Sequence, residues 1–249
     1  MSKGPPHLRL DRLLANLGYG SRREVGGLIG AGLVTLDGEA IIDSDERIAV
    51  TPDLSTRMIV DGEPLDPPPG FCLLMNKPLG VTCSHKEQGP LVYSLLPERW
   101  RRREPAISTV GRLDKDTSGL LLLTDDGALL HRIISPRSHV PKRYDVTLER
   151  PLRGDEVALF ASGEMMLEGE DKPLLPAHLE VASPTRAYVT ITEGRYHQVR
   201  RMLAAVGNHV AALHRDRVGD LPLPEDLAAG DYRILDDADI AQVFSAPKE

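Results

Sequence analysis

A short apolar run that follows directly on a polar loop constrains this chain most. The run is Leu120–Leu123, and Thr124–Gly127 ends it with residues that favour a turn. Four apolar residues between turn signals indicate a strand that is buried on both faces. The loop before it, residues 110–119, contains Asp114 among several other charged residues. A loop anchored in the core in this way can hold one side chain in the narrow geometry that a reactive site needs.

The acidic spacing in this loop allows three interpretations. Asp114-x-Asp116-x-Ser118 begins like a calcium-binding EF-hand loop, and Asp125 lies at its twelfth position. Calcium binding is excluded because the twelfth residue should be a bidentate Glu, the ninth (here Leu122) should supply oxygen, and helices should flank the loop. The same residues half-match the DxDx(T/V) signature of phosphotransferases, whose nucleophile ends an apolar strand. Residues 107–113 do not form a convincing strand of that kind.

The third interpretation is a family resemblance. Residues 111–127, Gly-Arg-Leu-Asp-x-x-Thr-x-Gly-Leu-Leu-Leu-Leu-Thr-x-Asp-Gly, resemble the catalytic motif of RNA pseudouridine synthases. Other motifs of this family are Asn-Lys-Pro-x-Gly at 76–80, Lys-x-Tyr at 142–144 and Gly-Arg-x-His-Gln-Val-Arg at 194–200. Several motifs in the expected order are much more specific than any one of them. The resemblance extends over residues 8–243.

The resemblance implies roles for individual residues. It makes Asp114 the catalytic carboxylate, places Tyr144 in the active site, and pairs Arg200 with Asp114 so that the carboxylate stays charged. Arg112 is expected to fill the space that a flipped-out uridine leaves in its stack. Without the resemblance, Tyr144 could equally pack inside a strand, and Arg200 could lie on a solvated helix face.

The amino-terminal residues indicate a separate RNA-binding domain. Leucines at 10, 13, 14 and 17 recur at helical spacing, and Ser21 with Glu24 forms a capping box that begins a second helix. Residues 9–38 resemble the S4 domain, whose helices present basic residues to structured RNA. Lys77 is expected to support the architecture of the first catalytic motif as well as to bind RNA. The expected RNA contacts of the whole chain are Arg9, Arg12, Arg22, Arg23, Lys77, Arg112 and Lys142.

These observations predict an α/β (α+β) protein of two domains. Residues 8–66 are expected to form the S4-like domain, residues 67–70 a proline-rich linker with few contacts, and residues 71–243 the catalytic domain. The resemblance implies a catalytic domain with a mixed, largely antiparallel sheet and a central cleft between its two halves. Periodicity alone indicates only alternating strands and helices.

The net charge of −7 is unusual for a protein that binds RNA, so its distribution matters more than its sum. Residues 37–66 hold nine acids and two bases, and residues 220–249 hold eight acids and two bases. The rest of the chain has 20 acids against 26 bases, a charge of +6. Basic faces are therefore expected on an acidic protein.

Several features bear on the compartment. No apolar run approaches the roughly 18–20 residues that span a bilayer, and residues 1–6 lack the apolar region of a secretory signal. Two cysteines, Cys72 and Cys83, have neither metal-ligand spacing nor a disulfide framework. We expect a cytoplasmic monomer that does not contact a membrane.

The expected reaction is the isomerisation of uridine to pseudouridine, which needs no redox change and no energy input. No cofactor and no metal are therefore expected. Segments 162–173 and 205–210 resemble the small-subunit branch of the family. The expected partner is 16S rRNA or a small-subunit assembly intermediate, with the uridine at position 516 as the target. The alternatives are a large-subunit (23S) rRNA synthase and a non-catalytic S4-type rRNA-binding factor.

Overall fold

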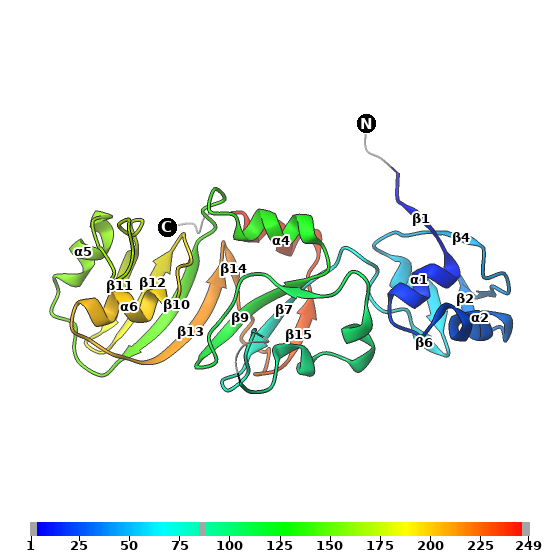
Figure 1. Cartoon of the computed structure of the whole chain (residues 1–249), viewed down its shortest axis with the longest axis horizontal. Helices are drawn as coiled ribbons and strands as arrows, with labels where there is room; N and C mark the ends of the chain where they lie inside the picture. Colours follow the sequence, from blue (N-terminus) through cyan, green and yellow to red (C-terminus); the bar gives the residue numbers. More distant parts are fainter. Residues whose placement is uncertain (1–3, 85–87, 246–249) are drawn as a thin grey trace. The chain divides into compact units, whose positions relative to one another are not determined.

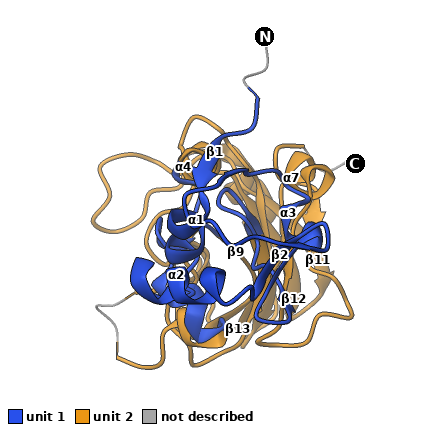
Figure 2. Cartoon of the chain, turned by 90° about the vertical axis from the view of Figure 1, so that its right-hand side faces the viewer, with its two compact units in different colours: residues 1–72, 96–108, 124–127 blue, residues 73–95, 109–123, 128–249 orange. Residues whose placement is uncertain are grey.

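The computed structural model describes residues 4–84 and 88–245, which divide into two compact units (Figure 2). Unit 1 comprises residues 1–72, 96–108 and 124–127, and unit 2 comprises residues 73–95, 109–123 and 128–249. Each unit is thus assembled from separate stretches of the chain. The expectation about a secretory signal falls partly on residues 1–3, which lie outside the described residues. No described helix is long and apolar enough to cross a membrane.

Unit 1 opens with two short helices packed on small sheets. Leu10, Leu13, Leu14 and Leu17 are fully buried, as the helical spacing predicts. The expected capping box is present at Ser21, whose hydroxyl accepts from the Glu24 N–H while its own N–H donates to the Glu24 carboxylate. The elements of the first 72 residues are β1 (His7–Arg9), α1 (Leu10–Asn16), α2 (Arg22–Gly30), β2 (Val34–Leu36), β3 (Glu39–Ala40), β4 (Arg47–Ala49), α3 (Leu54–Arg57), β5 (Met58–Val60) and β6 (Glu63–Pro64). They form a two-stranded sheet, β1-β4, and a four-stranded sheet, β3-β2-β5-β6.

The later segments of unit 1 are held by two arginine–aspartate pairs. Arg99, on the 3-10 helix η2 (Glu98–Arg102), donates to Asp66 from Nε at 2.6 Å and from Nη2 at 2.9 Å. Arg103 Nη2 lies 2.9 Å from Asp125 Oδ2, and both side chains are 1% exposed. Asp125 Oδ1 also accepts from the Gly70 N–H at 2.8 Å.

The proline-rich linker is therefore well connected. Arg103 Nη2 donates to the Pro67 carbonyl at 2.8 Å, and the Phe71 ring packs edge-on against Trp100 with centroids 5.5 Å apart. The expectation of few contacts at residues 67–70 is wrong. Prolines donate no backbone hydrogen bonds, but their carbonyls still accept them.

Unit 2 is built on a nine-stranded sheet with the order β11-β12-β10-β13-β9-β7-β15, to which β14 and β8 add at β13 and β9. Its strands are β7 (Cys72–Lys77), β8 (Ser108–Thr109), β9 (Thr117–Thr124), β10 (Lys142–Leu148), β11 (His178–Ser183), β12 (Arg186–Ile191), β13 (Val210–Val218), β14 (Leu221–Pro222) and β15 (Tyr232–Ile234). Its helices are η1 (Val92–Leu95), α4 (Gly127–Ile134), α5 (Glu156–Ser162), α6 (Gln198–Ala205) and α7 (Asp237–Val243). Figure 1 shows β10, β13 and β9 side by side.

The centre of this sheet confirms the strand that the apolar run predicts. Leu120–Leu123 lie in β9 and are at most 1% exposed. The pairs β10/β12, β10/β13, β11/β12, β13/β14 and β15/β7 are antiparallel, whereas β13 and β9 are parallel. The sheet is therefore mixed and largely antiparallel, as expected. Because the stretch from 117 to 124 is a strand, residues 114–125 do not form an EF-hand loop.

Candidate active site

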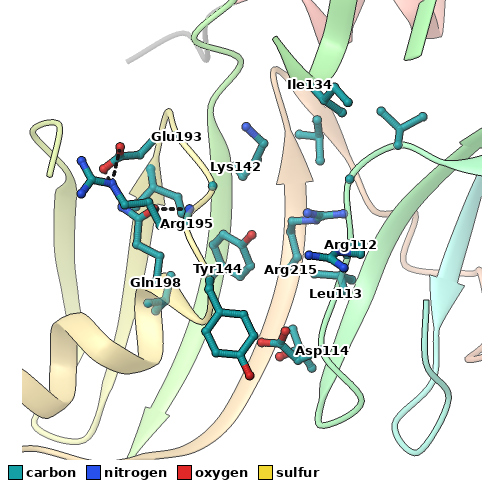
Figure 3. A pocket seen from close by; sticks show the side chains of 18 of the residues that line it. Arg112, Leu113, Asp114, Ile134, Lys142, Tyr144, Glu193, Arg195, Gln198 and Arg215 are labelled. Atoms are coloured by element: carbon teal, nitrogen blue, oxygen red, sulfur yellow. Dashed lines mark hydrogen bonds and ion pairs between the residues drawn. The ribbon is translucent and has the colours of Figure 1, made fainter. Parts of the chain in front are cut away.

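A pocket of about 510 Å³ lies within unit 2 and contains the residue at the centre of the sequence analysis. Asp114 lines it together with Arg112, Lys142 and Tyr144 (Figure 3). Its wall also includes charged and aromatic residues to which the sequence analysis gave no role: Glu193, Arg195, Tyr196, His197 and Arg215. The structure thus brings four of the predicted site residues together from two separate segments of the chain, 112–114 and 142–144.

The loop that carries Asp114 is held in place by the side chain of Lys77. The Lys77 Nζ donates to the carbonyls of Thr117 at 2.8 Å, Asp114 at 3.0 Å and Pro78 at 3.1 Å. The Thr117 N–H also donates to the Asp114 carbonyl at 3.0 Å, where β9 begins. Three charge-assisted hydrogen bonds from one ammonium hold the backbone on both sides of the loop in place.

Lys77 is wrong as an RNA contact. It is 0% exposed, so its ammonium cannot reach a phosphate. The architectural role expected for the same residue agrees with its three carbonyl partners. Lysine side chains are normally exposed to solvent, and the sequence does not show that the loop around Asp114 covers Lys77.

Close packing of two strands explains why the catalytic motif has a glycine at position 119. Its φ is +104°, and a Cβ placed there would lie 2.2 Å from the Arg215 carbonyl oxygen. A larger residue would therefore force β9 and β13 apart. This close approach lets the Arg215 Nε donate to the Leu120 carbonyl at 2.8 Å. The buried Arg215 guanidinium is held in the pocket wall as a result.

His197 is one residue that contacts the proposed catalytic carboxylate. Its Nε2 lies 3.3 Å from Asp114 Oδ1. The residue has a left-handed backbone, with φ 47°, immediately before α6. The Tyr196 ring stacks on the imidazole with centroids 3.9 Å apart and planes at 17°. A non-glycine residue in this conformation costs energy, and such strain is often found at functional sites.

Arg200 does not have the partner that was expected. Its Nη2 lies 3.0 Å from the carboxylate of Asp116 and donates to the Asp116 carbonyl at 2.9 Å. Its Nη1 donates to the Val210 carbonyl of β13 at 3.2 Å. The prediction that Arg200 pairs with Asp114 is therefore wrong. Two backbone carbonyls direct the guanidinium to the second acid of the loop, while the imidazole of His197 lies beside the first.

Tyr144 and Lys142 are held on β10, two residues apart and on the same face. Tyr144 is 8% exposed, and the Arg215 guanidinium carbon lies 6.0 Å from the centre of its ring. Burial and the neighbouring charge of Arg215 lower the pKa of Lys142 to about 8. An ammonium with this pKa is mostly charged at pH 7 and loses its charge as the pH rises through about 8.

The remaining arginines differ in how freely they can meet RNA. Arg112 is exposed at the pocket. Arg9 and Arg22 both pair with the buried Asp11, and Arg9 also pairs with Asp45. The exposed side chains of Arg12 and Arg23 make no ion pair within residues 4–84 and 88–245. Half of the predicted S4 contacts are thus already neutralised within the domain.

The chain belongs to the family of RNA pseudouridylate synthases, and its amino-terminal part is an S4 domain. The model described as RNA pseudouridylate synthase matches residues 72–205, and the S4 domain model matches residues 8–49. As family members these enzymes are isomerases, which confirms the expected class of reaction.

Named relatives match over almost the whole chain. The chain is 44% identical over 238 residues to "Ribosomal small subunit pseudouridine synthase A" of Yersinia pestis, covering 95% of this chain and 98% of the relative. The protein of the same name from Escherichia coli is 43% identical over 240 residues, covering 95% and 100%. A solved structure described as "Crystal structure of pseudouridylate synthase" superposes with a TM-score of 0.66 at 36% identity and covers 95% of this chain and 99% of that chain.

Proposed function

We propose that this enzyme converts a specific uridine of 16S rRNA to pseudouridine, acting as a cytoplasmic monomer during assembly of the small ribosomal subunit. The relatives that share over 40% of its residues along nearly their whole length bear the name of small-subunit synthases, which supports this substrate. The S4 domain supports binding to structured RNA. We assign RNA binding to residues 8–66 and the chemistry to residues 71–243, with residues 67–70 between them.

The observation that carries the proposal is the setting of Asp114. Its carboxylate opens into the pocket from a loop whose backbone is locked by Lys77. The reaction breaks the N1–C1′ bond of uridine, turns the base, and joins C5 to C1′. The proton lost from C5 is balanced by the one that N1 gains. A positioned carboxylate provides the nucleophilic or electrostatic assistance that this exchange requires.

Neighbouring side chains complete the assignment. His197 Nε2, 3.3 Å from Asp114 Oδ1, orients the carboxylate. Tyr144 presents its ring to the base and its hydroxyl for the proton step at C5. Arg200 keeps the loop closed through Asp116 and is a positioning residue. Arg112, exposed beside the pocket, takes the place of the flipped uridine.

The direct test is product mapping on an RNA without modifications. The full-length protein is incubated with a 16S rRNA transcript in chelator, without nucleotide, and pseudouridine is mapped by chemical modification and primer extension. One modified uridine is expected, with none in a 23S transcript treated in parallel. Asp114→Asn keeps the shape of the carboxylate but is expected to abolish turnover while RNA binding stays within about 3-fold, because only the nucleophile is lost. Modification of the 23S transcript instead would overturn the proposed substrate. Activity retained by Asp114→Asn would overturn the catalytic role of Asp114.

A further inference from the structure

The basic run at residues 99–103 divides into an inward and an outward pair. Arg99 and Arg103 are bound to Asp66 and Asp125 within unit 1, so they act as anchors. Arg101 and Arg102 lie between them and are exposed. Arg102 makes an ion pair with Glu98 in which both side chains are 69% exposed, a contact that contributes little to stability. Arg101 makes no ion pair with any described residue.

The segment that carries these arginines is seated against the turn between α1 and α2. The Glu104 N–H donates to the Asn16 carbonyl at 2.8 Å, and the Arg99 guanidinium lies 4.3 Å from the centre of the Tyr19 ring. A Cβ on Gly18 would come within 2.4 Å of the Arg99 carbonyl oxygen, so the two backbones are in close contact. Figure 2 shows residues 96–108 in the same compact unit as residues 1–72.

This arrangement brings Arg102 towards the start of α2. Hydrogen bonds from Ser21 lower the pKa of Glu24, and the charge of Arg102 contributes to the same shift. Arg23, which also has no ion-pair partner among the described residues, is the neighbour of Glu24 in the first turn of that helix. The outward arginines of η2 and those of the S4 helices therefore belong to one region of unit 1.

Charge is distributed unevenly among the sequence segments of unit 1. Residues 4–36 and 96–108 together carry eight arginines and four acids, whereas residues 37–66 carry nine acids and two arginines. η2 is seated on the α1–α2 turn of the basic segment, and among its described ion pairs only that of the inward Arg99 reaches the acidic segment, at Asp66. A basic surface is complementary to the phosphate backbone of RNA.

We propose that η2 extends the RNA-binding surface of the S4 domain, and that Arg101 and Arg102 contact RNA phosphates alongside Arg12 and Arg23. The proposal rests on the RNA substrate proposed above. The recognition surface is then composite, because residues that follow the domain by some thirty positions in the chain complete it. The arginines fix the orientation of the RNA and read no sequence, as phosphate contacts do.

Salt-dependent binding tests this composite surface. Affinity of the full chain for the 16S transcript is measured from about 50 to 200 mM salt, where each phosphate contact contributes about 0.7–0.9 to the slope of log affinity against log salt. Arg101→Gln should make the slope shallower by about 0.7–0.9, and the double variant with Arg102→Gln by about twice that amount. Arg101→Lys retains the charge and should retain the slope. Turnover at saturating RNA should not change.

Two matched variants distinguish the possible failures. Arg57→Gln removes an arginine from the acidic part of unit 1, where it pairs with Asp37 at 2.6 Å, and should leave the slope unchanged. Arg12→Gln should make the slope shallower, as Arg101→Gln does. An unchanged slope for both η2 variants, with a lower slope for Arg12→Gln, would overturn the composite surface and leave the S4 contacts standing. Unchanged slopes for the two η2 variants and for Arg12→Gln would show that none of these three arginines contacts RNA. Loss of RNA modification with normal slopes would count against the proposed activity alone.

Discussion

Replacing Arg103 with methionine should destabilise unit 1 more than any other single loss of charge described above. The guanidinium and the Asp125 carboxylate are each 1% exposed and 2.9 Å apart. Methionine keeps the apolar stem but leaves Asp125 with the Gly70 N–H as its described donor. Removing one partner of a buried pair costs about 3–5 kcal/mol because the other charge stays uncompensated. We expect the free energy of unfolding of unit 1 to fall by that amount.

The single tryptophan makes this loss measurable in the correct unit. Trp100 is buried in unit 1, and its ring packs on Phe71. Urea unfolding followed by tryptophan fluorescence should therefore report this unit, with a lower midpoint for Arg103→Met. The double variant with Asp125→Asn should recover most of the loss, because the buried charge is then absent. The Arg103 Nε and Nη1 are buried without a described partner, so the pair itself is not optimally satisfied.

The pH dependence provides a second reading. Burial raises the pKa of Asp125, and the Arg103 hydrogen bond opposes this shift. Without Arg103 the folded-state pKa rises further above the unfolded value, so the folded state takes up a proton that the unfolded chain does not. The penalty is then fully present at higher pH and shrinks as the pH falls through the folded pKa. A loss below about 1 kcal/mol, with no coupling in the double variant and no change between pH 8 and pH 5, would refute a water-excluded pair.

Three further predictions concern the pocket. Lys77→Met should lower the free energy of unfolding by about 2–4 kcal/mol and slow turnover, because buried carbonyls around Asp114 lose their donor. Urea unfolding and a rate assay check this prediction, and normal turnover would show that Lys77 does not position Asp114. RNA affinity should decline as the pH rises through about 8, where Lys142 loses its proton. Lys142→Arg should flatten that decline, because arginine stays charged. An equal decline of affinity in both proteins, measured by binding titrations, would contradict this prediction. Tyr144→Phe should retain RNA binding and slow single-turnover modification, and equal rates would limit Tyr144 to stacking.

Local patterns predicted the parts of the fold that depend on neighbouring residues. The buried strand at Leu120–Leu123 and the capping box at Ser21 follow from spacing alone, and both are present. The family resemblance supplied the sheet type. The inward direction of Arg99 and Arg103 could not be predicted, because a basic run reads as solvated surface until its buried partners are known.

The site was predictable in its members but not in its pairings. Asp114 and Tyr144 were expected in one pocket and line it. His197 was not singled out, although it stands within the quoted motif, because its contact depends on a left-handed backbone that sequence does not specify. Arg215 had a weaker signal: a charged residue on the inward face of β13, two positions from the buried Leu213. The partner of Arg200 depended on which of two acids faces it, and spacing cannot decide that.

The interleaved make-up of unit 1 has a consequence for synthesis of the chain. Residues 1–72 leave the ribosome first, yet the unit also needs residues 96–108 and 124–127. At about 5–20 residues per second, the roughly 55 residues from 73 to 127 take about 3–11 s to make. Asp66 lacks Arg99 and Phe71 lacks Trp100 until residues 99 and 100 are made, and Arg103 lacks Asp125 until residue 125 is made. The amino-terminal domain therefore reaches its final packing only after the strand that bears the catalytic loop has itself been translated.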